Sequence, residues 1–295
     1  MNDNINIKGW GTVTEGGSEI WHSEPIFPNS KISFLEKAKF LFYPKKYFLY
    51  NFLKKNLSNK KYKVNLLDVG CATGSSIVDL NNIFDGKVNL FGADVVKMQV
   101  DIAKQKLADR KINADIQWYG GNKLPFKDKI MDGIYTSDVL GHVNNVDRWL
   151  AELSRVLVSG GVLAMFSESE LGKHAILRKR LMKKGINIDP HSQFHISLYS
   201  KEELKRKIEK AGFEILEMRS SSVLHFFINP NEFYKALKNK KGFFFLKQIS
   251  RFLTFIKTKT HPYSTALLEF YGFLEMLVIG KKTEAQGYVI LAKKK

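Results

Sequence analysis

The sequence is short of cysteine, of acidic residues and of long apolar runs, and each shortage excludes a class of protein. Cys71 is the single cysteine in 295 residues, so an internal disulfide or a multi-cysteine metal site is excluded. No uncharged run of about 20 apolar residues occurs, which argues against a membrane-spanning helix. Residues 1–17 lack the basic-then-apolar pattern of a secretory signal, so we expect no export and a cytoplasmic location.

The shortage of acidic residues leaves a large positive charge. The chain has 47 lysines and arginines against 29 aspartates and glutamates, which gives a net charge of +18. Such an excess raises the local concentration of anionic partners such as nucleic acid, anionic lipid or phosphorylated substrates. Scattered lysines from a lysine-rich proteome would give the same total, so a selected basic surface and a compositional bias both stay open.

The rest of the chain is organised around residues 64–76, which read Val-Asn-Leu-Leu-Asp-Val-Gly-Cys-Ala-Thr-Gly-Ser-Ser. The apolar run that ends at Asp68 predicts a buried strand, and Gly70 and Gly74 predict a tight turn into a helix. Because the two glycines have no side chains, a ligand can lie directly on the main chain. The N–H groups of the first helical turn would then face a carboxylate or a phosphate.

Two cofactors compete for this turn. A dinucleotide fingerprint has Gly-x-Gly-x-x-Gly, whereas the corresponding positions here are Gly70, Ala72 and Ser75. Asp68 ends the strand just before the turn, where its carboxylate would repel a pyrophosphate and attract an ammonium and a sulfonium. This charge pattern favours S-adenosylmethionine.

The segment Leu-Leu-Asp-Val-Gly-Cys-Ala-Thr-Gly resembles motif I of the class I S-adenosylmethionine-dependent methyltransferases, in particular the type 11 or UbiE-like small-molecule group. The resemblance covers residues 63–220, and its further motifs follow in the order of the family: Phe91-Gly92-Ala93-Asp94, Leu124-Pro125-Phe126, Met131-Asp132-Gly133-Ile134-Tyr135, Val139-Leu140-Gly141-His142-Val143, Arg155-Val156-Leu157-Val158-Ser159-Gly160-Gly161 and Ala211-Gly212-Phe213. An ordered series of this kind is far more specific than a single glycine-rich turn.

Alternating strand and helix patterns after residue 60 predict an α/β fold. The resemblance implies a Rossmann-like, doubly wound, seven-stranded and mostly parallel sheet. We predict an N-terminal arm and helical cap over residues 1–60, a cofactor-binding core over 61–220, a helical insertion over 221–285 as a lid or membrane-facing element, and a final core strand with a basic tail over 286–295. The N-terminal helices either cover the mouth of the active site, as the resemblance implies, or pack against the edge of the sheet.

The predicted cofactor contacts cluster at the turn and at the ends of the following strands. Asp94 lies about 20 residues beyond the glycine turn, where a carboxylate accepts hydrogen bonds from ribose hydroxyls. Val95 and its apolar neighbours would contact the adenine ring, and the resemblance assigns Asn122 to the adenine amino group and Ser137 to a segment that faces the transferred methyl. The complete predicted set is Asp68, Gly70, Cys71, Ala72, Gly74, Asp94, Val95, Asn122 and Ser137.

Two histidines are the catalytic candidates. His142 matches a histidine that is common in the family after the fourth strand, where it either transfers a proton or only shapes the pocket. His195 lies just before a helix capped by Ser200 and has the unperturbed pKa range of a general base. His191 and His195 have the i, i+4 spacing of a metal-binding pair, but Pro190 precedes them and no third ligand is evident, so we predict no metal.

The predicted insertion contains a basic amphipathic helix. Its apolar positions recur at helical spacing and its polar positions lie on the opposite side: Phe245, Ile249, Phe252 and Ile256 against Lys247, Arg251 and Thr254. A second, nearly all-apolar helix is predicted over residues 266–279, and the pair either packs into the core or lies on an anionic bilayer, to which the neighbouring lysines would be attracted. The second case implies peripheral contact with the inner face of a membrane.

For function, we predict an S-adenosylmethionine-dependent methyltransferase that acts on an oxygen, or less favourably a carbon, of a small-molecule, lipid-linked or glycan acceptor. The Asn-Pro-Pro-Tyr segment of exocyclic base methylation and the Pro-Cys nucleophile of cytosine methylation are both absent, which weakens a nucleic-acid base as substrate. The alternatives are an RNA-directed methyltransferase, whose RNA affinity would fall steeply with salt, and a non-catalytic S-adenosylmethionine-binding protein. No pattern predicts an oligomeric state.

Overall fold

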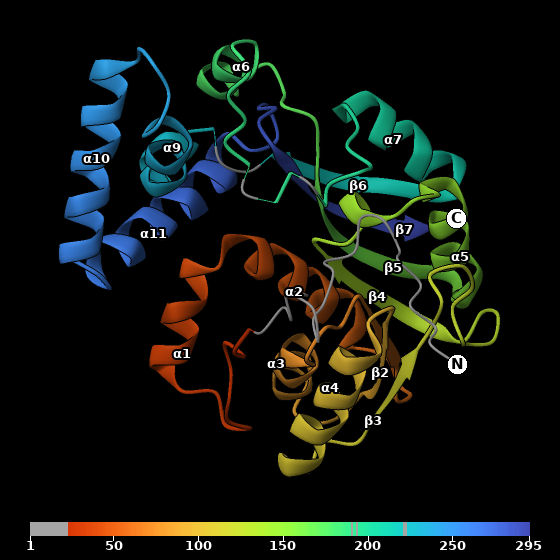
Figure 1. Cartoon of the computed structure of the whole chain (residues 1–295). Helices are drawn as coiled ribbons and strands as arrows, with labels where there is room; N and C mark the ends of the chain where they lie inside the picture. The colour runs from red at the N-terminus through yellow and green to blue at the C-terminus, as the bar shows by residue number, and fades with distance from the viewer. Residues whose placement is uncertain (1–22, 190, 193, 221–222) are drawn as a thin grey trace, which may run out of the picture.

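The computed structural model describes residues 23–189, 191–192, 194–220 and 223–295, which form a seven-stranded sheet with helices on both faces (Figure 1). The strand order is β3-β2-β1-β4-β5-β7-β6, and β7 runs antiparallel to β5 and β6 whereas β1 to β5 are parallel. The strands are β1 (Asn65–Val69), β2 (Asn89–Asp94), β3 (Ala114–Trp118), β4 (Met131–Ser137), β5 (Leu157–Glu168), β6 (Phe213–Ser220) and β7 (Gly287–Lys294). The predicted fold class is therefore confirmed.

The core occupies both faces of the sheet. Neighbouring residues of a strand point to opposite faces, so Leu66 of β1 packs into a first apolar cluster and Leu67 into a second. The helices divide between the two clusters in the same way. Residues of the first cluster come from α2 (Pro44–Leu57), α3 (Ser75–Ile83), α4 (Lys97–Asp109) and α11 (Tyr263–Val278). Residues of the second cluster come from α5 (Val146–Val156) and α7 (Lys201–Lys210).

The N-terminal helices contribute both to the core and to the site. α1 (Phe34–Lys39) begins at a capping box of Ser33 and Glu36 and continues into η1 (Phe40–Phe42). α2 packs across β4, β5 and β7, which places it over the middle of the sheet rather than at its edge. Its first turn carries Lys45 and Lys46 to the cavities at the strand ends. The predicted N-terminal arm lies outside the described residues up to residue 22.

The predicted insertion is helical and is partly built into the core. It contains α8 (His225–Ile228), α9 (Pro230–Leu237), α10 (Phe244–Lys259) and α11. α11 packs on α2 and η1, where Phe273 stacks on Phe48 with ring centroids 6.0 Å apart. Arg219 of β6 donates to the carbonyl oxygens of Met276 and Leu277 at 3.0 and 2.9 Å, which satisfies two acceptors at the end of α11.

α10 lies against α9 at the outside of the molecule and turns its apolar side to solvent (Figure 1). Phe245 is 79% exposed and Phe252 is 62% exposed, whereas Ser250 is buried. Lys257, on the polar side, donates to the carbonyl oxygen of Ile228 at 2.6 Å. The interpretation that the apolar side of this helix packs into the core is therefore wrong. Among the described residues, no helix combines the length and the apolarity needed to cross a membrane.

Candidate active site

The predicted cofactor turn joins β1 to α3 in a conformation that requires small residues. Gly70 has a φ angle of +79° and Ala72 one of +45°. A Cβ atom on Gly70 would lie 2.2 Å from Cγ2 of Val139, so space as well as conformation demands glycine. The N–H groups of Gly70 and Cys71 donate to the carbonyl oxygen of Ala93 at 2.8 and 3.2 Å, and these bonds tie the turn to the end of β2.

Asp94, the last residue of β2, also connects the turn to the end of this strand. Its carboxylate oxygens accept hydrogen bonds from the N–H groups of Ala72 at 2.8 Å and of Val96 at 2.9 Å. Burial raises the pKa of Asp94 above its ordinary value. Each oxygen of an ionised carboxylate has two lone pairs, so acceptor positions remain for the hydroxyls of a ligand.

A cavity of about 460 Å³, here called the cofactor cavity, opens over the turn at the carboxyl ends of β1, β2 and β4. Ligands of doubly wound sheets bind in a crevice at this position. The structure brings seven of the predicted site residues into its lining: Gly70, Cys71, Ala72, Asp94, Ser137, His142 and His195.

The other four predicted contacts lie outside the lining of the cofactor cavity. Gly74 is the N-cap of α3, and Val95 packs into the second apolar cluster while its neighbour Val96 lines the cavity. Asn122 is exposed on the loop after β3. Asp68 is only 1% exposed behind the turn, and burial raises its pKa to about 8. The roles of these four residues stay predictions.

Gln99 is a cavity residue that sequence reasoning missed. It lies in the first turn of α4 and is 3% exposed, and its Oε1 atom has no hydrogen-bond partner among the described residues. A buried amide oxygen without a partner is costly, so this atom offers an acceptor to a donor group of a ligand. In the sequence, the one signal for Gln99 is its position shortly after Asp94, at the start of the helix that follows β2.

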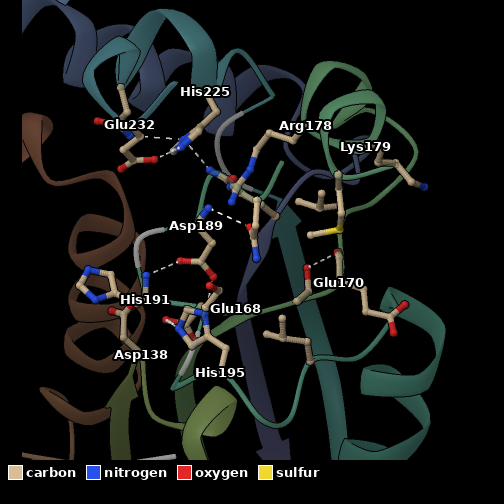
Figure 2. Close-up of a pocket in the computed structure, with 18 of the residues that line it drawn as sticks. Asp138, Glu168, Glu170, Arg178, Lys179, Asp189, His191, His195, His225 and Glu232 are labelled. Carbon is tan, nitrogen blue, oxygen red and sulfur yellow. Dashed lines mark hydrogen bonds and ion pairs between the residues drawn. The ribbon is translucent and has the colours of Figure 1, made fainter. Parts of the chain in front are cut away.

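A larger cavity of about 820 Å³, here called the acceptor cavity, lies beside the first (Figure 2). Its walls come from the start of α2, the end of β5, α6 (Ile176–Met182), the described residues of the loop that precedes α7, and the helices α8 and α9. Arg178 projects into it from α6, and burial lowers the pKa of this guanidinium. The two cavities meet, because both are lined by Asp138, Glu168, His191 and His195.

Carboxylates dominate the electrostatics where the cavities meet. Lys45 donates to Asp138 at 2.8 Å and lies 3.7 Å above the ring of Phe166. Burial alone would raise the pKa of Asp138, but the Lys45 ammonium holds that pKa at about 2. The pKa of Glu168 is raised well above its ordinary value, by burial and by the neighbouring Asp138 carboxylate. The junction therefore favours a ligand or an ion that brings positive charge.

His142 and His195 lie beside each other at this junction, with ring centroids 5.0 Å apart. Nδ1 of His195 is 2.7 Å from a carboxylate oxygen of Asp189, and Nδ1 of His142 is 3.1 Å from the carbonyl oxygen of Phe194. In the neutral rings each Nδ1 donates its proton to that oxygen, which leaves the lone pair on Nε2. Such a nitrogen can accept a proton from a hydroxyl or coordinate a cation.

Part of this site lies in a region that is similar in sequence to known proteins. A family model described as a methyltransferase domain matches residues 67–165. The O-methyltransferase cnsE of Penicillium expansum is 29% identical over 157 residues, which are 52% of this chain and 53% of that protein. The O-methyltransferase resE of Aspergillus sclerotiorum is 31% identical over 157 residues, which are 52% of this chain and 56% of that protein. The chain thus spans about half the length of these curated relatives.

A solved structure of similar fold is that of the (4+2)-cyclase SpnF, with a TM-score of 0.54 and 19% sequence identity over 93% of this chain and 87% of that chain. A likeness at this identity concerns the fold alone. The family match, by contrast, covers the glycine turn, Asp94, Ser137 and His142. Residues 67–165 therefore match a methyltransferase domain, which is the domain expected from the resemblance to the class I S-adenosylmethionine-dependent methyltransferases.

Proposed function

We propose that this protein transfers the methyl group of S-adenosylmethionine to an oxygen atom of a small-molecule acceptor. The meeting of the two cavities at Asp138, Glu168, His191 and His195 is the observation that carries this proposal. With the cofactor over the glycine turn and the acceptor in the larger cavity, the reacting atoms would lie at this junction. The O-methyltransferases of similar sequence support oxygen over carbon as the acceptor atom.

The residues of the cofactor cavity suit this cofactor. Asp94 offers acceptor positions to ribose hydroxyls, and the unpartnered Oε1 of Gln99 offers one to an amino group. The carboxylates of Asp138 and Glu168 would face a sulfonium. When bound, S-adenosylmethionine supplies an electrophilic methyl group whose bonding electrons stay with sulfur on transfer.

The chain's own contribution to the reaction is positioning and removal of a proton. Methyl transfer is an in-line displacement, and holding the two reacting atoms in line supplies much of the rate. The acceptor hydroxyl must also lose its proton as its oxygen bonds to the methyl carbon. We propose that His142 and His195 act on this hydroxyl, because their rings stand at the junction with Nε2 as the basic atom.

Calorimetric titration of S-adenosylhomocysteine tests whether the protein binds the proposed cofactor. Wild-type protein is expected to bind, and Asp94→Ala is expected to bind roughly 30-fold less tightly, because charged hydrogen bonds to the ribose contribute about 2 kcal/mol. Asp101→Ala, which removes an exposed carboxylate of α4, is the matched control and should bind like wild type. No binding by the folded wild type would refute the proposal.

The acceptor half is tested with methyl-labelled cofactor and a panel of phenols, sugars and lipid-linked alcohols. An ether product resistant to mild base is the expected result. Label on carbon would move the proposal to the less favoured acceptor atom. S-Adenosylhomocysteine binding without transfer to any acceptor, RNA included, would favour the non-catalytic alternative.

We also propose that α10 holds the protein peripherally on an anionic membrane surface. Its aromatic side is exposed, and its sequence has four cations and no acidic residue: Lys247, Arg251, Lys257 and Lys259. Exposed apolar surface of this extent is unusual in a soluble monomer and marks a contact site. A basic amphipathic helix lies in the bilayer interface, with its aromatic side chains among the acyl chains and its cations at the headgroups.

Flotation with phosphatidylglycerol-containing vesicles tests this placement. The wild type is expected to float with them but not with pure phosphatidylcholine vesicles. The double variant Phe245→Ser/Phe252→Ser should lose roughly 1,000-fold in partitioning, because burial of each phenylalanine contributes about 2 kcal/mol. Leu216→Ser is the control, since Leu216 is also about half exposed (50%) but lies on β6. Absence of flotation, or a dimer that depends on Phe245 and Phe252, would refute the placement.

A further inference from the structure

Three side chains from separate segments converge where the two cavities meet. His142 ends the short helix η2 (Leu140–His142), Glu168 is the last residue of β5, and His195 lies in the loop before α7. One potential ligand atom from each lies within 4.8 Å of the other two. Figure 2 shows Glu168 and His195 close together between Asp138 and Asp189. His142 and Glu168 are thus the partners of His195 that the spacing of His191 and His195 did not predict.

The two rings are oriented by bonds on the far side of each imidazole. Asp189 accepts from Nδ1 of His195 at 2.7 Å, and the carbonyl oxygen of Phe194 accepts from Nδ1 of His142 at 3.1 Å. Metal-bound histidines typically donate their other ring N–H to a carboxylate or to a backbone carbonyl in this way. Both rings therefore have the tautomer that presents Nε2 as a ligand atom.

The segments that carry the side chains are fastened to each other. The carbonyl oxygen of Gly141 accepts hydrogen bonds from the N–H groups of Ile196 and Ser197 at 2.8 and 3.0 Å. A Cβ atom on Gly141 would lie 3.1 Å from Oε2 of Glu168 and 3.4 Å from Cδ2 of His195, so glycine allows this close approach. The geometry of the three side chains is preorganised by the backbone.

One oxygen of the carboxyl group in this cluster lacks a protein partner. Oε2 of Glu168 is buried without a hydrogen-bond partner among the described residues, and Oε1 is 3.9 Å from Nε2 of His195, which is too far for a hydrogen bond. The Lys45 ammonium in the same cavity is bonded to Asp138 instead. Burying unpaired acceptor atoms is costly, and a cation between them removes that cost.

We propose that His142, Glu168 and His195 bind one divalent transition-metal ion, with Zn²⁺ as the representative probe. Two neutral imidazoles and one carboxylate suit ions of this class, whereas Mg²⁺ and Ca²⁺ prefer oxygen ligands. Three protein ligands leave at least one coordination position for another group. The metal binding itself does not depend on any reaction catalysed at the site.

The role of the ion rests on the proposed methyl transfer. Glu168 and His195 line both cavities, so an ion held by them lies where an acceptor hydroxyl would meet the methyl group. The ion would bind the hydroxyl oxygen and lower its pKa, and the proton would be released to solvent water. The oxygen would then form its bond to carbon while the carbon–sulfur bonding electrons stay on sulfur. A ring nitrogen that is bound to the ion cannot also accept a proton, so in the metal-loaded protein the ion would replace His142 and His195 as the group that acts on the hydroxyl.

Binding of Zn²⁺ and Co²⁺ to protein freed of metal by a chelator tests the proposal. Calorimetry with Zn²⁺ is expected to give one site. The Co²⁺-bound protein should show the visible absorption bands that are typical of a cobalt ion with a low coordination number. Zn²⁺ binding should weaken by roughly 100-fold or more in each of the variants Glu168→Gln, His142→Ala and His195→Ala. It should weaken by about 10-fold or more in Asp189→Asn, because this variant no longer orients the His195 ring. His191→Ala removes a histidine that lines the same cavities and should leave Zn²⁺ affinity unchanged.

Circular dichroism and thermal unfolding report whether each variant is folded, and the binding of S-adenosylhomocysteine by the wild type separates the two proposals. Zn²⁺ affinity that is lost in the three ligand variants but kept in His191→Ala supports the site, whether or not methyl transfer is found. Absence of a Zn²⁺ site in the folded wild type, or equal Zn²⁺ affinity in wild type and Glu168→Gln, would overturn it. Methyl transfer by chelator-treated protein at the full rate would overturn the role of the ion.

Discussion

Replacing His195 by alanine is expected to lower kcat for methyl transfer by roughly 100- to 10,000-fold, the range for loss of a group that assists proton transfer. The ring lines both cavities, and Asp189 holds its Nδ1 at 2.7 Å. The affinity for S-adenosylhomocysteine should change far less than kcat, because the glycine turn and Asp94 are untouched. Steady-state kinetics with the acceptor found by labelling, together with calorimetry, measure the two quantities separately.

His174→Ala is the matched control for this substitution. His174 lies outside both cavities and accepts a hydrogen bond from the N–H of Glu284 at 3.0 Å, so kcat should remain that of wild type. The kcat of Asp189→Asn should lie between those of His195→Ala and His174→Ala. We expect a drop in kcat of about 10-fold or more and a displaced pH–rate profile, because the His195 ring loses its carboxylate partner. A kcat for His195→Ala within tenfold of wild type would show that His195 does not act on the acceptor.

Gly70→Ala is expected to lower the free energy of unfolding by about 3 kcal/mol and to abolish S-adenosylhomocysteine binding. The φ of +79° costs a residue with a Cβ atom roughly 1 kcal/mol. The added carbon would lie 2.2 Å from Cγ2 of Val139, and relief of such overpacking costs about 2 kcal/mol more. Denaturant unfolding and calorimetry give the two results.

Gly185→Ala separates the conformational cost from the steric one. Gly185 has a φ of +71°, but a Cβ atom built there meets nothing within 4 Å. This control should therefore lose only about 1 kcal/mol and bind S-adenosylhomocysteine like wild type. If the two glycine variants were equally destabilised, the contact with Val139 would not be a constraint on the turn.

Local patterns predicted the elements well and their boundaries less well. The capping boxes at Ser33 and Ser200 begin α1 and α7 as expected, since each depends on residues three positions apart. The family motif over residues 155–161 spans the end of α5 and the start of β5. α5 ends at Val156 and β5 begins at Leu157, which pairs with Met131 of β4. The pairing with β4 resumes at Val162, opposite Gly133, so residues 158–161 interrupt the ladder, and Gly160 has a φ of +75° there.

Long-range packing decided the orientation of α10. The spacing of Phe245, Ile249, Phe252 and Ile256 predicts one apolar side but not its direction. Lys257 bonds to the carbonyl oxygen of Ile228, and Phe245 and Phe252 stay exposed. An amphipathic pattern specifies which residues share a side, and only the neighbouring helices specify what that side meets.

The sequence by itself determined the cofactor half of this protein. The turn at Gly70, the carboxylate at Asp94 and the alternation of strands and helices all depend on residues close together in the chain, so their patterns are readable without coordinates. Only the tertiary structure decided the partners of His195. Parallel pairing of β4 and β5 brings His142 and Glu168 to one edge of the sheet, and the carbonyl of Gly141 draws the His195 loop to them. No local pattern encodes that convergence, because it arises from hydrogen bonds between segments far apart in the sequence.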